Sequence, residues 1–157
     1  LLLHLYRIDD AASLRRSDAV CSALQLINFW QDLSIDLPRG RVYVPASDLM
    51  RHGLTPADLG DGDSPRTKAL VADLVAWARS LMLEGAPLVH RVPGRAGWEL
   101  RLVVQGGLRI LDKIEANGFN ALSQRPTIGA LDAPRLLWRA LWMRRGPPAL
   151  LSGPAAR

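Results

Sequence analysis

Four polar side chains recur at helical spacing in the segment 24–36, and their types suit the binding of a cation. With about 100° per residue and Gln25 at zero, Asn28 falls near −60°, Asp32 near −20° and Asp36 near +20°. Two carboxylates at i and i+4 repel each other unless a cation lies between them. Oxygen ligands favour Mg²⁺, which is commonly shared between protein carboxylates and substrate phosphates. We therefore predict that Asp32 and Asp36 bind Mg²⁺, and that Asn28 adds a carbonyl ligand or a hydrogen bond.

The rest of this helix predicts that the polar stripe lines a cavity. The opposite side carries the apolar residues Ala23, Leu26, Ile27, Trp30 and Leu33. A helix buried on most sides does not turn its remaining stripe freely to bulk water. An exposed acidic helix face is the alternative, and it is the usual meaning of an isolated Asp-x-x-x-Asp pair.

Two arginines follow the acidic stripe directly. Arg39 and Arg41 are close enough in sequence to face the same cavity. Because arginine binds phosphate oxygens through two parallel hydrogen bonds, carboxylates, metal and arginines together indicate a diphosphate site. A pair of surface arginines in a turn is the alternative.

The elements that must position these residues are helices, so the predicted fold class is all-α. Apolar residues recur with a period of 3.6, Pro and Gly interrupt them, and no alternating strand pattern persists. We expect a first helix ending near Ile8, long helices over 13–36, 66–90 and 98–117, an extended piece at 39–45, short turns at 48–52 and 55–59, and a last amphipathic helix over 134–145. Residues 1–145 are predicted to form one domain, or part of one, and residues 146–157 a disordered tail.

Composition narrows the function classes. The 157 residues are 48% hydrophobic and 22% charged, and the single Cys21 excludes an internal disulfide. The formal charge is −2 up to Arg66, from seven basic and nine acidic residues, and +7 afterwards, from thirteen and six. This basic excess suits an anionic substrate, an anionic membrane surface or merely a solvated face. Nucleic acid is disfavoured because no binding motif is present.

The run Gln25-x-x-Asn28-x-x-x-Asp32-x-x-x-Asp36-x-x-x-Gly40-Arg41-x-Tyr43-x-Pro45 resembles the second aspartate-rich motif of the squalene/phytoene synthase family. The resemblance extends over Ser17-Asp18-Ala19, residues 97–101 and residues 106–115. These details resemble most the hydroxysqualene synthases of bacterial hopanoid biosynthesis.

The resemblance implies an isoprenoid-synthase-type helical bundle, of which this chain holds the C-terminal half. It implies that Asp32 and Asp36 bind Mg²⁺, that Gln25 and Asn28 line the diphosphate pocket, and that Arg41 and Tyr43 contact or shape the diphosphate end. The implied reaction converts presqualene diphosphate and water to hydroxysqualene and diphosphate. Phe29 is the aromatic candidate for stabilising the carbocation, although ordinary helix packing also explains it.

Family members carry another aspartate-rich motif on an upstream helix, which this sequence does not contain. We therefore expect an N-terminal half of the same fold as a partner, and little or no activity from this chain alone. Gly107 stands where we align a late tyrosine of the carotenoid-type enzymes, which weighs against a phytoene synthase. The expected localisation is cytoplasmic, possible membrane contact being peripheral and through residues 134–145.

Two alternatives remain open. One is a synthase that joins two farnesyl diphosphates head to head, which the motifs present do not distinguish. The other is a noncatalytic basic helical module that binds a membrane surface through its last helix.

Overall fold

The computed structural model describes residues 2–143, which are helical throughout their regular parts and contain no strand. The all-α prediction is therefore confirmed. In chain order the helices are α1 (Leu2–Leu5), α2 (Ala11–Gln31), α3 (Leu33–Asp36), α4 (Ala46–Arg51), α5 (Pro65–Gly85), α6 (Gly94–Ala116) and α7 (Ala133–Leu141). Short 3-10 turns lie at Leu37–Arg39, Ala57–Leu59, Ala86–His90 and Ala130–Asp132. The predicted tail at 146–157 lies outside the described residues.

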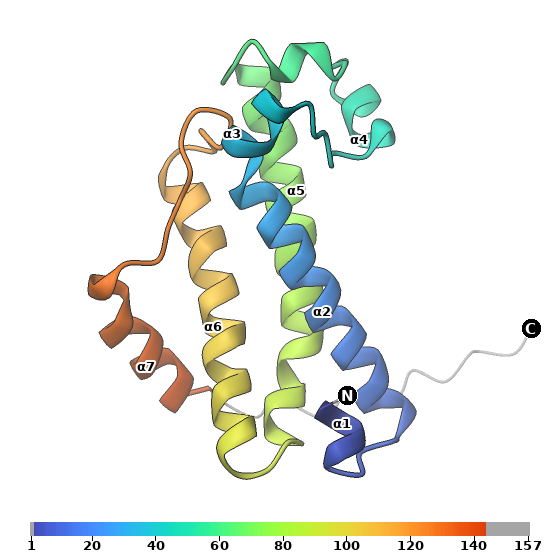
Figure 1. Cartoon of the computed structure of the whole chain (residues 1–157), viewed down its shortest axis with the longest axis vertical. Helices are drawn as coiled ribbons and strands as arrows, with labels where there is room; N and C mark the ends of the chain where they lie inside the picture. Colours follow the sequence, from blue (N-terminus) through green and yellow to red (C-terminus); the bar gives the residue numbers. More distant parts are fainter. Residues whose placement is uncertain (1, 144–157) are drawn as a thin grey trace, which may run out of the picture.

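Three long helices, α2, α5 and α6, run side by side and enclose the core (Figure 1). The largest fully buried side chains between them are Trp30, Leu70, Leu74, Met82, Leu111 and Ile114. Two glycines permit the close approach. A Cβ on Gly85 would lie 2.6 Å from the carbonyl oxygen of Arg16, and one on Gly107 would lie 2.8 Å from Cε of Met82. Small residues thus fix how tightly α5 and α6 pack around α2.

Local signals explain where the long helices begin. The Asp10 carboxylate accepts a hydrogen bond from the backbone N–H of Ser13 at 2.9 Å and caps α2. Ser64 and Thr67 form a reciprocal capping box at the start of α5.

The predicted 66–90 helix ends as an α-helix at Gly85 and continues as a 3-10 turn. Trp77 shares the helical spacing of Leu70 and Leu74 but is exposed, because the buried stripe centres on Leu70, Leu74 and Met82.

The predicted 13–36 helix is interrupted at Asp32. Helix α2 ends at Gln31, Asp32 has φ −99° and ψ 9°, and α3 begins at Leu33. The hydrogen-bond ladder nevertheless continues, since Asp32 N–H donates to the Asn28 carbonyl at 3.0 Å and Asp36 N–H to the Asp32 carbonyl at 2.9 Å. The helical stretch then ends at Gly40, whose φ of 72° lies in the left-handed region that glycine adopts without steric cost. The bend therefore leaves both aspartates at the same end of the molecule.

The two ends of the bundle carry different structures (Figure 1). Helices α3 and α4 lie at one end, and α1 lies at the other, packed through Leu3 against Leu88 and Val92. Helix α1 is shorter than predicted because it ends at Leu5, and Arg7 then takes a positive φ of 54°. Helix α7 lies beside α6, away from α2. Among the residues that the structure describes, no helix combines the length and apolar composition that a bilayer crossing requires.

Candidate functional site

The inner side of α2 is buried as its sequence predicts. Ala23, Ile27, Trp30 and Leu33 are inaccessible or nearly so, and Leu26 is partly buried against the same core. On the other side, Gln25 and Asn28 are exposed to solvent. Helix α2 therefore presents its polar stripe on the face that α5 and α6 leave uncovered.

Each aspartate of the stripe is partly exposed and pairs with one arginine. The side chain of Asp32 is 33% exposed, and its Oδ1 accepts a hydrogen bond from Nε of Arg125 at 2.6 Å. The side chain of Asp36 is 15% exposed, and its Oδ1 lies 3.6 Å from Nη1 of Arg41. The hydrogen bond from Arg125 to Asp32 raises the pKa of the Arg125 guanidinium above its ordinary value. Carboxylate and guanidinium groups thus alternate at this end of the molecule.

Sequence reasoning missed Arg125, because it lies 93 residues after Asp32 in an irregular loop with no motif of its own. The loop is anchored on both sides. Gln31 Nε2 donates to the Pro126 carbonyl at 2.8 Å, and the Asp63 carboxylate accepts from the backbone N–H groups of Leu122 and Ser123 at 3.2 and 3.1 Å. Only the packing of α6 against α2 brings this loop to the acidic stripe.

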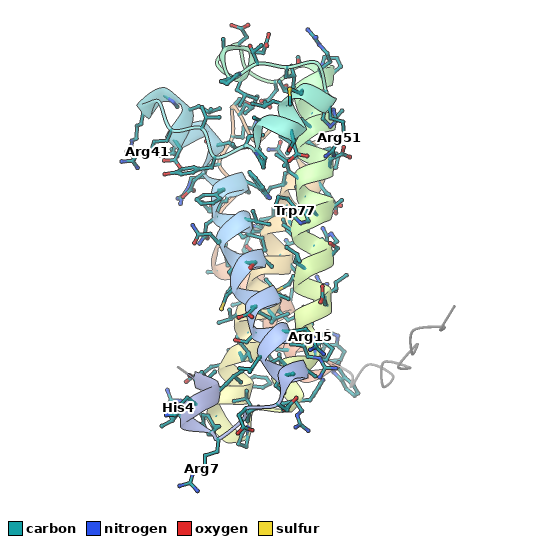
Figure 2. All side chains as sticks on the ribbon, turned by 90° about the vertical axis from the view of Figure 1, so that its right-hand side faces the viewer. His4, Arg7, Arg15, Arg41, Arg51 and Trp77 are labelled. Atoms are coloured by element: carbon teal, nitrogen blue, oxygen red, sulfur yellow. The ribbon has the colours of Figure 1, made fainter. Side chains whose placement is uncertain are left out.

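The aromatic and basic residues after the stripe lie at the same end. The rings of Phe29 and Tyr43 stack with centroids 4.2 Å apart and an angle of 10° between their planes. Tyr43 is exposed and Phe29 half-buried. Arg39 and Arg41 are both exposed, and Figure 2 shows Arg41 projecting from the end of the molecule opposite His4 and Arg7. The extended segment after Gly40 therefore brings Tyr43 back onto α2.

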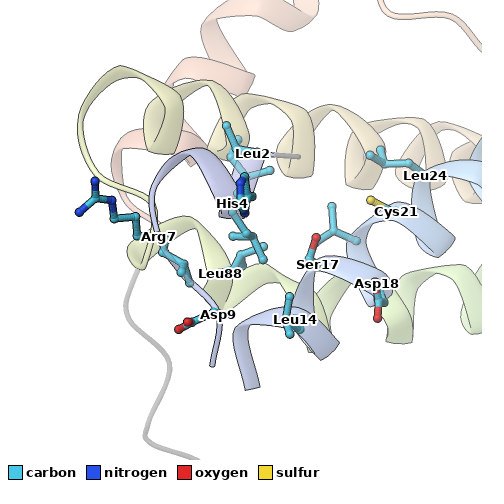
Figure 3. Close-up of a pocket in the computed structure, with 14 residues that line it drawn as sticks. Leu2, His4, Arg7, Asp9, Leu14, Ser17, Asp18, Cys21, Leu24 and Leu88 are labelled. Carbon is cyan, nitrogen blue, oxygen red and sulfur yellow. The ribbon is translucent and has the colours of Figure 1, made fainter. Parts of the chain in front are cut away.

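A cavity of about 730 Å³ opens along the earlier turns of the same helix (Figure 3). Its lining comes from α1, from the segment that connects α1 to α2, from α2 and from two leucines elsewhere, namely Leu2, Leu3, His4, Arg7, Ile8, Asp9, Leu14, Ser17, Asp18, Val20, Cys21, Leu24, Leu88 and Leu100. At about 100° per residue, Leu14, Ser17, Cys21 and Leu24 fall in the same sector of α2 as Asn28 and Asp32.

The acidic stripe lies beyond this cavity, and its expected position along a cavity wall stays a prediction. Gln25, Asn28, Asp32 and Asp36 lie outside the lining of this cavity, since α1 covers only the first turns of α2. The distance along the helix axis from Leu24 to Asp32 is about 12 Å, at about 1.5 Å per residue. One face of α2 thus has a largely apolar hollow along its first turns, with charged side chains such as Arg7 and Asp18 in its wall, and a polar end at Asp32.

Comparison with protein families decides the assignment. Residues 1–132 match the model of the family described as "Squalene/phytoene synthase". The chain belongs to this family. A phytoene synthase from Thermus thermophilus is 39% identical over 128 residues, which are 80% of this chain and 44% of that protein. Phytoene synthase 1 from Arabidopsis thaliana is 31% identical over 108 residues, covering 68% of this chain and 26% of that protein.

A solved structure of the squalene/phytoene synthase type supports the fold. The crystal structure of squalene synthase HpnC from Alicyclobacillus acidocaldarius superposes with a TM-score of 0.70 and 37% identity. The match covers 75% of this chain and 45% of that one. The chain thus spans less than half the length of the Thermus and HpnC relatives, and it shares the fold of the HpnC structure.

The donor atoms present fit part of a Mg²⁺ site. Asp32, Asp36 and the Asn28 carbonyl offer the hard oxygen ligands that this cation prefers. The structure contains no group of three or more His, Cys, Asp or Glu side chains placed to hold a metal ion within residues 2–143. Two carboxylates are enough to hold Mg²⁺ where substrate phosphates and water supply the remaining ligands, as they commonly do for this cation.

Proposed function

We propose that this chain provides the second aspartate-rich part of a Mg²⁺-dependent synthase that acts on long isoprenoid diphosphates. The reaction that we propose first is the conversion of presqualene diphosphate and water to hydroxysqualene and diphosphate. The observation that carries this proposal is the single face of α2, which has a largely apolar cavity along its first turns and carboxylates paired with arginines at its end. A ligand with a hydrocarbon chain and a diphosphate matches that division.

The polar end supplies the groups that such a leaving group requires. Asp32 and Asp36 would hold Mg²⁺ with the Asn28 carbonyl, and the bound ion would neutralise charge that develops on the diphosphate. Arg41 and Arg125 lie beside these carboxylates and can donate hydrogen bonds to phosphate oxygens. Gln25, Asn28 and Arg39 are exposed on the approach to this end and can bind the outer oxygens.

The chemistry balances without another reactant. The bond between carbon and the diphosphate oxygen breaks, and its electron pair leaves with the diphosphate. Water adds to the resulting cyclopropylcarbinyl cation and loses a proton, which gives hydroxysqualene. The stacked Phe29 and Tyr43 rings offer a π face near the polar end that favours positive charge.

The head-to-head condensation of two farnesyl diphosphates is the main alternative within the same class. The names of the Thermus and Arabidopsis relatives favour a condensing enzyme. Gly107 favours the first proposal, because a Cβ there would already lie 2.8 Å from Met82 and 3.1 Å from Ile27, which leaves no space for a tyrosine. This distinction rests on our alignment of Gly107 with the late tyrosine of carotenoid-type enzymes.

Ligand binding by the chain tests the proposal. Farnesyl diphosphate is titrated into the 157-residue protein by calorimetry with and without Mg²⁺. We expect Mg²⁺-dependent binding that Asp32→Asn and Asp36→Asn weaken at least about tenfold, since a charge-assisted contact is worth roughly 1.5–3 kcal/mol. Asp61→Asn, at an exposed loop position, is the control. Equal affinity in all variants refutes the assignment of the acidic stripe.

A chimera identifies the reaction. Residues 11–132 replace their counterparts in the HpnC squalene synthase, and the products from presqualene diphosphate and from farnesyl diphosphate are identified by mass spectrometry. Hydroxysqualene from the first substrate supports the primary proposal. Condensation products from the second substrate, without hydroxysqualene, favour the alternative.

The noncatalytic candidate is a helical module that binds a membrane surface. The exposed apolar side chains of α7 favour it. We propose a peripheral location on the cytoplasmic face of a membrane in either case, because the proposed substrates and products are long hydrocarbons. Membrane binding without any Mg²⁺-dependent affinity for farnesyl diphosphate would support the noncatalytic candidate.

A further inference from the structure

Helix α7 turns its apolar side away from the rest of the molecule. Trp138 and Trp142 are 63% and 66% exposed, and their rings lie 5.5 Å apart. Leu141 is 62% exposed, and Leu131, in the turn before the helix, is 96% exposed. With Leu137 these side chains form what we call the outer apolar face. Amphipathic helices of globular proteins normally bury such a face.

Ion pairs with α6 hold the helix in this orientation. Nη1 of Arg139 donates to Oδ2 of Asp112 at 2.8 Å, and Nη1 of Arg79 donates to the other oxygen at 3.0 Å. Burial alone would raise the pKa of Asp112, but the hydrogen bonds from Arg139 and Arg79 outweigh it and lower that pKa. Ala140 is fully buried beneath the helix. The inner side of α7 is therefore held by these ion pairs and by Ala140, and Met143, directly after the helix, packs against the core.

A second ion cluster fixes the turn that precedes α7. The carboxylate of Asp132 is 4% exposed and accepts from Nε of Arg109 at 2.7 Å and from the backbone N–H of Gly129 at 2.8 Å. Nζ of Lys113 lies 2.6 Å from its Oδ2. The bond from Lys113, then those from Gly129 and Arg109, hold the pKa of Asp132 far below its ordinary value. Both ends of the inner side are thus anchored, so the outer apolar face is a fixed feature of the fold.

The sequence around this face is strongly cationic. Residues 133–157 contain five arginines and no acidic residue, whereas residues 1–132 contain equal numbers of basic and acidic residues. The formal charge of +5 of the whole chain therefore comes from this last part. Arg135 is exposed at the margin of the apolar face, and Arg144 and Arg145 follow the helix directly in sequence.

We propose that α7 is an interfacial helix that binds the surface of an anionic lipid bilayer. In this arrangement Trp138, Trp142 and Leu141 enter the boundary between headgroups and acyl chains, and the arginines contact lipid phosphates. Tryptophan favours this boundary because its ring is apolar and its N–H is polar. The proposal goes beyond the candidate site, since α7 follows the family-matched residues 1–132 and lies beside α6 away from α2.

Charge favours a bilayer over a second copy of the chain. In a twofold symmetric dimer each residue faces the same patch of its partner, so arginine-rich segments would be brought together. Like charges brought together oppose association, whereas anionic headgroups attract them. Vesicle binding therefore should depend on the lipid charge and fall at high salt.

Vesicle co-sedimentation of the 157-residue protein tests the proposal. We expect binding to vesicles of phosphatidylcholine with phosphatidylglycerol, and weaker binding to phosphatidylcholine alone. Trp138→Ala/Trp142→Ala should lower the affinity at least about tenfold, since the two aromatic side chains would no longer be removed from water by the bilayer. Trp77→Ala/Leu83→Ala, at exposed positions on α5, is the matched control.

Further variants separate insertion, charge and folding. Trp138→Phe/Trp142→Phe should keep most binding but lose the blue shift of tryptophan fluorescence, which Trp77→Phe retains. Arg144→Gln/Arg145→Gln should reduce the preference for anionic vesicles, and Arg51→Gln/Arg95→Gln, at exposed positions elsewhere, should not. Circular dichroism verifies that each variant is folded. Calorimetry with farnesyl diphosphate, unchanged by the α7 variants, distinguishes this contact from the proposed function.

Three outcomes overturn the proposal. The first is a folded wild-type protein that binds neither kind of vesicle. The second is an equal loss of binding in the α7 and α5 double variants. The third is a dimer in analytical ultracentrifugation that Trp138→Ala/Trp142→Ala dissociates while vesicle binding is absent, which would assign the face to a second copy.

Discussion

The two sides of α2 are built from one continuous stretch of sequence and have opposite properties. The inner side packs Ile27, Trp30 and Leu33 into the core, and the side chain of Trp30 is 0% exposed. The outer side exposes Gln25 and Asn28 and ends at the partly exposed Asp32. Adjacent residues such as Ile27 and Asn28 thus have different roles: Ile27 packs in the core, and Asn28 is exposed at a position that the stability of the fold does not require.

The difference indicates where function can be changed without unfolding the chain. A buried apolar side chain loses its van der Waals contacts when it is truncated, and the surrounding structure cannot fill the space completely. An exposed polar side chain exchanges hydrogen bonds with water at little cost. Substitutions on the two sides of α2 should therefore separate stability from ligand binding.

The largest effect is expected on the inner side. Trp30→Ala should lower the free energy of unfolding by about 3–5 kcal/mol, as truncations of large buried aromatics do. The measurement is urea denaturation followed by circular dichroism. Trp30→Phe is the conservative comparison, because Nε1 of Trp30 has no hydrogen-bond partner that phenylalanine would leave behind. A loss as large with phenylalanine as with alanine would contradict this account.

The next largest effect on stability is expected where α6 contacts the inner side of α2. Gly107→Ala should lower the free energy of unfolding by about 1–3 kcal/mol, because the new methyl would overlap Met82 and crowd Ile27. Gly106→Ala is the matched control, since its Cβ meets nothing closer than Ile128 at 3.8 Å. Thermal melts of both variants test the difference. Equal melting temperatures would mean that the helices separate easily at Gly107.

A smaller effect on stability is expected on the outer side. Asn28→Ala should change the free energy of unfolding by no more than about 0.5 kcal/mol, because its side chain is exposed. The same variant should weaken Mg²⁺-dependent binding of farnesyl diphosphate, which calorimetry measures. Unchanged binding would remove Asn28 from the proposed site, and a large loss of stability would place it in the core.

The most subtle test compares carboxylates by their pH dependence. Asp132 has a lowered pKa in the folded protein, so its contribution is fully present above the ordinary value of 3.8 and is lost as the pH falls toward the folded-state pKa. Melting temperatures should therefore fall less steeply below pH 3.8 in Asp132→Asn than in the wild type. Asp61→Asn, at an exposed loop position, is the control and should follow the wild-type profile. Parallel profiles for all three proteins would contradict the role of the Asp132 cluster.

Sequence reasoning predicted much of the fold and the acidic stripe. Periodicity gave the all-α class and the buried side of α2, because each depends on which side chains recur every three to four residues. Periodicity does not account for the exposure of Trp77, which shares that spacing with Leu70 and Leu74 but is 43% exposed. It also missed Arg125, since a loop has no periodicity and its position depends on α6.

The sequence by itself determined the helices, the family and the stripe from Gln25 to Asp36, because local hydrogen bonding and residue spacing are encoded within a few turns. Only the tertiary structure decided that α2 bends at Asp32, that Arg125 reaches this aspartate, and that α7 turns its tryptophans outward. These features depend on contacts between residues that are distant in sequence. Such contacts are set by the packing of whole helices, and no short segment contains the information that specifies them.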